Sequence, residues 1–334
     1  MKLKVETGLK RLPFITFALL PAACLVFFCC GLKPTNAQEP RVNLETRPAS
    51  SGGADRLASI RINSDLVLIP VLVTDHRDHP ITGLQKDHFK LYDDKVEQVI
   101  SNFTSEDAPV SITLLFDCSG SMGPKLQKSR AAVREFLQTA NPEDEFSLIE
   151  FADRAHLVSE FTGKIEEIQN QLMFAGSKGA TALLDAIYLA VNQMKHAKHT
   201  RKAILIISDG GDNSSRYTTK EVKNSLREAD VQVYSIGIVE PFGGRMTPEE
   251  MAGPVLLQDI AQETGGRLFE VNDLNELRDI AVRIGAALRN EYVLGYVPTE
   301  SKRDGKYHRI QVKVERLKGL PPLRATFRSG YYGR

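Results

Sequence analysis

The chain has 334 residues, of which 25% are charged and 42% hydrophobic, and its formal net charge is +1. This length allows about two domains, and the composition is that of a globular protein, which excludes a disordered or fibrous chain. A charge so close to zero excludes the strongly basic surface of a nucleic-acid-binding protein, so we expect no nucleic-acid partner.

The N-terminal segment, residues 1–37, predicts an export signal or an anchor. Four basic residues up to Arg11 precede an uncharged run over 12–32, and small residues at 35–37 suit cleavage. The run is longer than a usual signal core of about 7–15 residues, and a membrane span needs about 20. We therefore expect export to the periplasm, the cell envelope or the medium. Cleavage, lipidation at Cys24 and retention as a membrane attachment stay open.

Residues 38–57 and 58–107 differ in composition. The first stretch holds Pro, Ser, Gly and Asn with little apolar content, which is typical of a linker. The second alternates apolar runs with turns and predicts a β-rich flank. Its polar turn over 75–80 contains two Asp and two His, which we interpret as a solvated hairpin tip and not as a metal site. The expected strands are 60–62, 66–73, 89–95 and 98–103, and the last two form a hairpin.

From 109 to 290, apolar strands alternate with amphipathic helices, which is the pattern of a parallel α/β sheet. The expected strands 146–151 and 156–161 are separated only by a short link around Asp153 and Arg154. Because parallel neighbours need a long crossover, this pair must be antiparallel. The expected strands are 111–116, 146–151, 156–161, 203–208, 231–238 and 266–271, and the expected helices are 125–139, the segment after Thr181, and 274–288.

Residues 291–334 return to β patterning, with strands expected at 292–298, 307–314 and 324–328. Neither this C-terminal flank nor residues 58–107 have enough apolar surface to fold alone. We therefore expect the two flanks to form one small β-sandwich that brackets the α/β domain.

Five polar residues follow strands or begin a helix in the α/β segment. Asp117, Ser119 and Ser121 lie on a Gly-bearing turn after strand 111–116. Thr181 ends a Gly-bearing loop before a helix, and Asp209 follows strand 203–208. Open α/β sheets bind ligands beyond the carboxyl ends of their strands. Carboxylate and hydroxyl oxygens suit Mg²⁺, Mn²⁺ or Ca²⁺ and not zinc, so the sequence predicts a divalent-cation site.

These residues, in this order, resemble the metal-ion-dependent adhesion site of von Willebrand factor type A domains. The resemblance covers about residues 109–290 and implies a doubly wound, mostly parallel sheet with one antiparallel edge strand. It also implies that Asp117, Ser119, Ser121, Thr181 and Asp209 hold the metal, with Mg²⁺ expected and Mn²⁺ or Ca²⁺ as alternatives. The flanks resemble a bacterial family in which this domain sits between short β-rich segments.

The resemblance implies that an Asp or Glu of a protein partner completes the coordination of the metal. We therefore expect an exported, metal-dependent protein-binding module for adhesion or scaffolding. Two alternatives stay open: a metal-dependent hydrolase, and an envelope component whose metal only stabilises the fold. Ser119 and Ser121 have no evident base, since His156 falls on the edge hairpin, so we expect no enzyme.

Three further features have two interpretations each. Cys118 could be a redox switch, but we favour a small apolar residue that points into the core. Asp212 could assist the metal, but we favour a solvated turn residue. The connection 239–253 is long, which favours a partner-recognition loop in which Phe242 and Arg245 contact the partner. Its alternative is a solvated loop with one short helical turn over 247–251.

Overall fold

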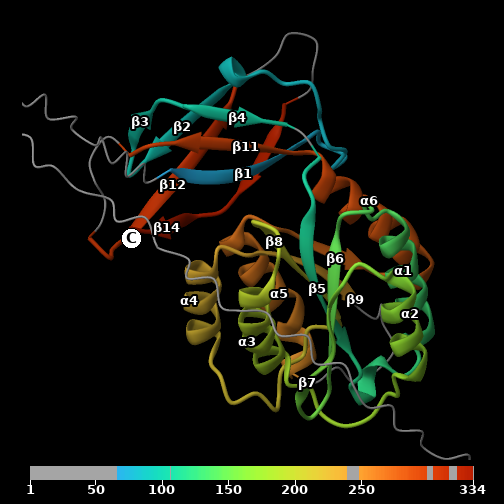
Figure 1. The fold of residues 1–334 in the computed structure, drawn as a ribbon. Coiled ribbons are helices and arrows are strands. Elements are labelled where there is room, and N and C mark those ends of the chain that lie inside the picture. The colour runs from blue at the N-terminus through green and yellow to red at the C-terminus, as the bar shows by residue number, and fades with distance from the viewer. Residues whose placement is uncertain (1–65, 106, 239–247, 299–303, 316–321, 334) are drawn as a thin grey trace, which may run out of the picture. The chain divides into compact units, whose positions relative to one another are not determined.

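The computed structural model describes residues 66–105, 107–238, 248–298, 304–315 and 322–333. These residues form an α/β part around a six-stranded sheet and a β part with two four-stranded sheets (Figure 1). The predicted signal or anchor, the linker, the strand 60–62 and most of the loop 239–253 lie outside the described residues. Among the described residues, no helix is both long enough and apolar enough to cross a membrane.

The six-stranded sheet has its strands in the order β10-β9-β8-β5-β6-β7. All neighbours are parallel except β6 and β7, which pair antiparallel across the short link at Asp153. The predicted mixed sheet with one antiparallel edge strand is confirmed. The strands are β5 (Val110–Asp117), β6 (Glu145–Phe151), β7 (Ala155–Thr162), β8 (Arg201–Ser208), β9 (Gln232–Ile238) and β10 (Leu268–Val271).

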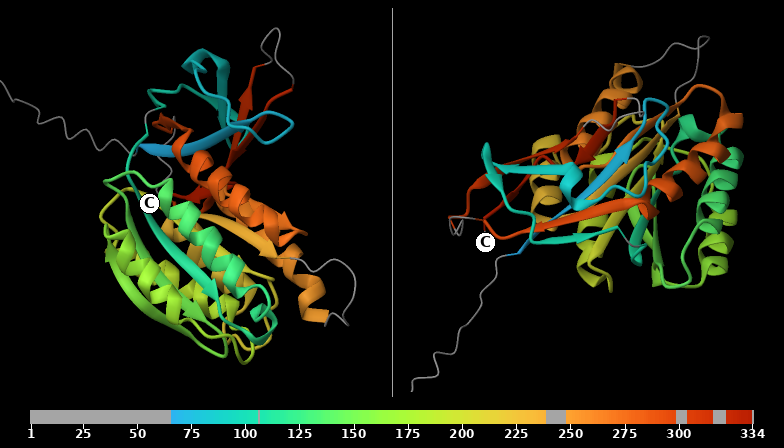
Figure 2. Two further views of the ribbon diagram at one scale, coloured as in Figure 1. Left: turned by 90° about the vertical axis from the view of Figure 1, so that its right-hand side faces the viewer. Right: turned by 90° about the horizontal axis from the view of Figure 1, so that it is seen from above.

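Helices cover both faces of this sheet (Figures 1 and 2). Leu114 and Phe116 of β5 pack into the core under α1, α2 and α6, whereas Leu115 packs into the core under α3, α4 and α5. Because helices cover both faces, every residue of β5 is buried, and its apolar residues do not alternate with exposed polar ones. The helices are α1 (Leu126–Gln138), α2 (Ile165–Phe174), α3 (Leu183–Gln193), α4 (Thr219–Ala229), α5 (Pro248–Thr264) and α6 (Leu277–Arg289).

Helix α5 corrects the prediction for the connection after β9. We expected irregular chain through residue 253, with at most a short helical turn, but a helix begins at Pro248 and continues to Thr264. Proline fits the first position of a helix because its fixed φ is already helical and its missing N–H would have no partner there. The predicted recognition loop therefore shrinks to 239–247, which lies outside the described residues.

The β part is a sandwich built from both flanks, as predicted. One sheet has the order β13-β1-β11-β4 and the other β14-β12-β2-β3, so each mixes N-terminal and C-terminal strands. Ile69, Leu91, Tyr292 and Ile310 share its core. The strands are β1 (Val67–Thr74), β2 (Phe89–Asp93), β3 (Val96–Gln98), β4 (Asn102–Thr104), β11 (Glu291–Tyr296), β12 (Tyr307–Val314), β13 (Arg324–Phe327) and β14 (Gly330–Tyr332).

One predicted hairpin differs from the structure. Strand β2 pairs with the short β3 and not with a strand over 98–103. The turn is at Asp94 and Lys95, whose φ angles are 49° and 72°, the left-handed conformation that tight hairpins require. The chain then changes sheets, and β4 pairs with β11. The apolar residue Ile100 is buried at this crossing, which explains why its run resembles the continuation of a strand.

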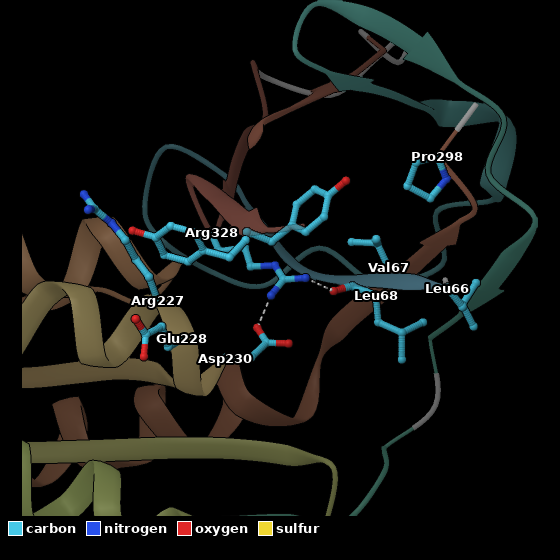
Figure 3. Close-up of a pocket in the computed structure, with 10 residues that line it drawn as sticks. Leu66, Val67, Leu68, Arg227, Glu228, Asp230, Pro298 and Arg328 are labelled. Carbon is cyan, nitrogen blue, oxygen red and sulfur yellow. Dashed lines mark hydrogen bonds and ion pairs between the residues drawn. The ribbon is translucent and has the colours of Figure 1, made fainter. Parts of the chain in front are cut away.

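Polar contacts join the sandwich to the α/β part. Glu291 is 1% exposed and accepts hydrogen bonds from Tyr234, Gln232 and Arg201. Figure 3 shows a second junction, where Arg328 reaches the carboxylate of Asp230 and the carbonyl of Leu68 beside a cavity of about 290 Å³. Since the buried carboxylate of Glu291 accepts its hydrogen bonds from residues of the α/β part, the two parts stabilise each other.

Candidate metal-binding site

The predicted site residues lie at the carboxyl edge of the six-stranded sheet. Asp117 is the last residue of β5, and Asp209 directly follows the neighbouring parallel strand β8. The loop that carries Thr181 is bound to the turn after β5. The amide of Gly120 donates to the Gly179 carbonyl (3.0 Å), and the amide of Lys178 donates to the Cys118 carbonyl (2.9 Å). The three segments therefore meet at one edge.

Asp117 is fully buried, and both of its carboxylate oxygens are held in place. One accepts the backbone amide of Ser119 (2.8 Å), and the other accepts the hydroxyl of Ser208 (2.5 Å). Burial, with a contribution from the charge of Asp209, raises the pKa of Asp117 to about 6. Ser208 escaped the sequence analysis because a serine at the end of an apolar strand carries no motif. The carboxylate is thus fixed at the sheet edge in a dry environment, where a cation would stabilise its charge.

The two serine hydroxyls of the turn after β5 lie next to each other. Their oxygens are 3.2 Å apart, and Ser119 is 1% exposed whereas Ser121 is half-buried. The hydroxyl of Ser177 donates to the carbonyl of Ser119 (2.5 Å), so the loop before Thr181 also fixes this turn. The pair offers two adjacent neutral oxygens, one of them accessible from solvent.

Asp209 is 7% exposed, and its two carboxylate oxygens differ. Oδ2 lies 3.3 Å from Nζ of Lys125, whereas Oδ1 is buried without a hydrogen-bond partner among the described residues. A buried carboxylate oxygen without a partner lowers the stability of the fold, because it has lost its hydrogen bonds with water and forms none within the protein. Sequence reasoning missed Lys125 as a site residue. The available signal is its place four residues after Ser121, directly before α1.

Thr181 is 5% exposed and is held by the loop that follows β8. Its amide donates to the side chain of Asn213 (2.9 Å), and its carbonyl accepts the amides of Asn213 and Ser214. Asp212, expected as a solvated turn residue, is half-buried and accepts the amide of Leu184 and the hydroxyl of Ser215. It therefore orients the start of α3, and with it the loop of Thr181.

Gly179 and Asp153 explain how the Thr181 loop keeps its shape. Gly179 has φ +85°, and a Cβ there would lie 2.5 Å from the carboxylate of Asp153. That carboxylate accepts the amide of Ala180 (2.6 Å). Only glycine fits this close approach without strain. Asp153 was assigned merely to the link between two strands, since its contact with residue 180 is not visible in the sequence.

The donor set fits a hard divalent cation. Its atoms are carboxylate and hydroxyl oxygens, which Mg²⁺, Mn²⁺ and Ca²⁺ prefer. Such an ion would supply a partner for the buried Oδ1 of Asp209 and a positive charge near the buried Asp117. The thiol of Cys118 is directed into the hydrophobic core, and burial raises its pKa to about 12. This placement agrees with the favoured interpretation of Cys118 as a core residue.

Several acidic and histidine groups outside this site have structural partners. In the sandwich, Asp93 accepts the hydroxyls of Tyr296 and Tyr331, and His308 lies between Asp94 and Asp304. Asp93, Asp94 and His308 form a cluster, in which one possible ligand atom of each residue lies within 4.8 Å of the others. In the turn over 75–80, Asp75 accepts the amides of Arg77 and His79 and so holds the turn.

His156, named in the enzyme alternative, and His199 contact other groups. His156 lies on β7, 3.8 Å from Glu150, and the ring of His199 lies 2.8 Å from the carbonyl of Glu143. Neither has a hydrogen bond to Ser119 or Ser121 in the part of the chain that the structure describes.

Fold and side chains together define a class: an α/β protein that gathers acidic and hydroxyl groups at the carboxyl edge of a doubly wound sheet. Comparison with known proteins specifies the domain. The family model of the von Willebrand factor type A domain matches residues 112–211. The chain therefore contains a von Willebrand factor type A domain, as its sequence predicts.

Curated relatives align with up to about half of this chain. An uncharacterized protein of Borreliella burgdorferi is 28% identical over 190 residues, which are 50% of this chain and 55% of that protein. Inter-alpha-trypsin inhibitor heavy chain 4 of Mus musculus is 26% identical over 153 residues, 41% of this chain and 16% of that protein. The chain thus spans about half of the first relative and less of the second.

Among solved structures, a von Willebrand factor type A protein from Catenulispora acidiphila is similar to this chain. It is 14% identical, the match covers 80% of this chain and 74% of that chain, and the TM-score is 0.48.

Proposed function

We propose that this protein is an exported, metal-dependent protein-binding module, used for adhesion or scaffolding. Asp117, Ser119, Ser121, Thr181 and Asp209 hold one divalent cation, Mg²⁺ in the first place and Mn²⁺ or Ca²⁺ as alternatives. An Asp or Glu side chain of a protein partner binds to the cation from solvent. The apolar N-terminal segment directs export and offers a means of membrane attachment.

The observation that carries the proposal is the unpartnered, buried Oδ1 of Asp209 beside a dry Asp117 at the same sheet edge. Lys125 supplies one positive charge to this pair, but Oδ1 of Asp209 has no hydrogen-bond partner in the described part of the chain, and a divalent cation would provide one. The adjacent hydroxyls of Ser119 and Ser121 add neutral oxygens. Together with the ammonium of Lys125, a divalent cation would give the site one more positive charge than its two carboxylates balance, so the site can take one anionic ligand from outside. Because Ser121 is half-buried and not covered, that ligand can approach from solvent.

One relative supports the choice of a binding role over an enzymatic one, because inter-alpha-trypsin inhibitor heavy chain 4 is named as a chain of an inhibitor and not as an enzyme. Within the described residues, the serines at the metal site have no histidine as a base.

The proposal is tested by affinity capture from envelope extract. The immobilised chain should retain partner proteins in Mg²⁺ and release them in EDTA. Asp117→Ala should retain none in either buffer, with an unchanged circular dichroism spectrum. Asp75→Ala, at a turn of the sandwich, is the matched control and should behave as the native chain. Equal capture in EDTA and Mg²⁺ would contradict the proposal.

A further inference from the structure

A lysine ammonium lies inside the proposed metal site. The side chain of Lys125 is 6% exposed, and its Nζ lies 3.3 Å from Oδ2 of Asp209. Lysine is almost never buried to this degree unless it is paired. Its position is fixed by the start of α1, since its amide donates to the Met122 carbonyl and its own carbonyl accepts the amide and the hydroxyl of Ser129. The fold therefore fixes this charge beside Asp209, at the sheet edge that also carries Asp117.

Two buried carboxylates at one sheet edge repel each other, and water cannot screen them well. Asp117 is 0% exposed and Asp209 is 7% exposed. Hydrogen bonds from the Ser119 amide and the Ser208 hydroxyl serve Asp117, but they bring no net charge. Lys125 brings a full positive charge to Asp209 at hydrogen-bond distance. The same charge would repel a divalent cation bound between the aspartates, because interactions in such a site are far stronger than in water.

We propose that Lys125 is a built-in counter-ion of this site, which stabilises the metal-free fold and lowers the affinity for the divalent cation. The inference rests on the proposed metal-dependent function. It adds a regulatory consequence: the acidic group of a partner offsets the repulsion between Lys125 and the cation, so metal and partner bind together more tightly than either binds alone. Such coupling is reciprocal, since each ligand strengthens the other by the same factor.

The test compares Lys125→Met with Lys128→Met in the full chain. Methionine keeps the unbranched apolar stem of lysine and removes only the charge. Lys128 lies in the first turn of α1, three residues after Lys125, but is exposed, with Nζ bonded to Asn275. Its variant is therefore a control for the loss of one positive charge. Mn²⁺ affinity is measured by electron paramagnetic resonance, and Tm is measured in EDTA.

Lys125→Met should bind Mn²⁺ at least about tenfold more tightly than the native chain, while Lys128→Met should bind it equally. In EDTA, Lys125→Met should melt about 5 °C or more below the control. The double variant Lys125→Met/Asp209→Asn, which removes both charges of the pair, should regain most of that Tm and should bind Mn²⁺ weakly.

Unchanged or weaker Mn²⁺ binding by Lys125→Met would overturn the counter-ion role and leave the proposed function standing. A double variant that melts no higher than Lys125→Met would also overturn it, because the loss would then come from packing and not from charge. If neither the native chain nor Lys125→Met binds Mn²⁺, the proposed function and the inference both fail.

Discussion

Asp117 links the stability of the metal-free protein to pH. Burial raises its pKa from 3.8 to about 6, so between these values the folded chain binds a proton that the unfolded chain has lost. Its contribution to stability is therefore complete below about pH 4 and is lost as the pH rises to about 6. We expect the native chain in EDTA to lose up to about 3 kcal/mol over this range relative to Asp117→Asn. Urea unfolding at a series of pH values measures the difference, and parallel profiles would contradict the prediction.

Cys118 should be unreactive in the folded protein. Its side chain belongs to the hydrophobic core, and burial raises its pKa to about 12, so hardly any nucleophilic thiolate exists near neutral pH. We expect alkylation of Cys118 at pH 8, followed by peptide mass spectrometry, to be at least about 100-fold slower than in urea. Lys178→Cys provides an exposed thiol in the neighbouring loop as the control. Equal labelling of both cysteines would show that residue 118 is accessible.

The loop before α3 depends on glycine at position 179. Gly179→Ala would combine φ +85° with a Cβ 2.5 Å from the Asp153 carboxylate, so we expect a loss of about 1–3 kcal/mol of stability. The displaced Thr181 should also weaken Mn²⁺ binding. Gly176→Ala, in the same loop, is the control, since a Cβ there meets no atom within 4 Å. Similar stability and affinity in both variants would show that the loop adapts.

Elements that depend on local pattern could be predicted from the sequence, whereas elements that depend on distant contacts could not. The strand ending at Asp117 and the antiparallel pair around Asp153 follow from apolar runs and a short link. The change of sheet before β4 does not, because its partner β11 lies almost 200 residues further along the chain. The start of α5 was missed because Pro248 could equally belong to a loop.

The same limit applies to the site. Its five predicted residues carry a recognisable order, and the structure brings their three segments to one sheet edge. Lys125, Asp153 and Ser208 act through partners 84, 27 and 91 residues away, and no local pattern reports such contacts. Charge balance around the metal is therefore a property of the folded chain.

At the scale of the molecule, Glu291 couples the sandwich to the α/β part. It is 1% exposed and pairs with Arg201 of β8, so Glu291→Ala leaves a mostly buried guanidinium without its carboxylate partner. The remaining acceptors of this guanidinium among the described residues are the carbonyls of Ala108 and Leu288. We expect a loss of about 3–5 kcal/mol in urea unfolding. Glu315→Ala, which breaks an exposed pair with Lys90, is the control and should cost less than about 1 kcal/mol. Similar losses in the two variants would show that the junction contributes little to stability.

The central claim is that the carboxyl edge of the sheet holds a divalent cation, and anomalous diffraction from crystals grown with Mn²⁺ tests it most directly. We expect one strong anomalous peak in contact with the hydroxyl oxygens of Ser119 and Ser121 and close to Asp117 and Asp209. Crystals of Asp117→Ala grown in the same way should show no such peak. A peak only at the cluster of Asp93, Asp94 and His308, or no peak in the native crystals, would contradict the account.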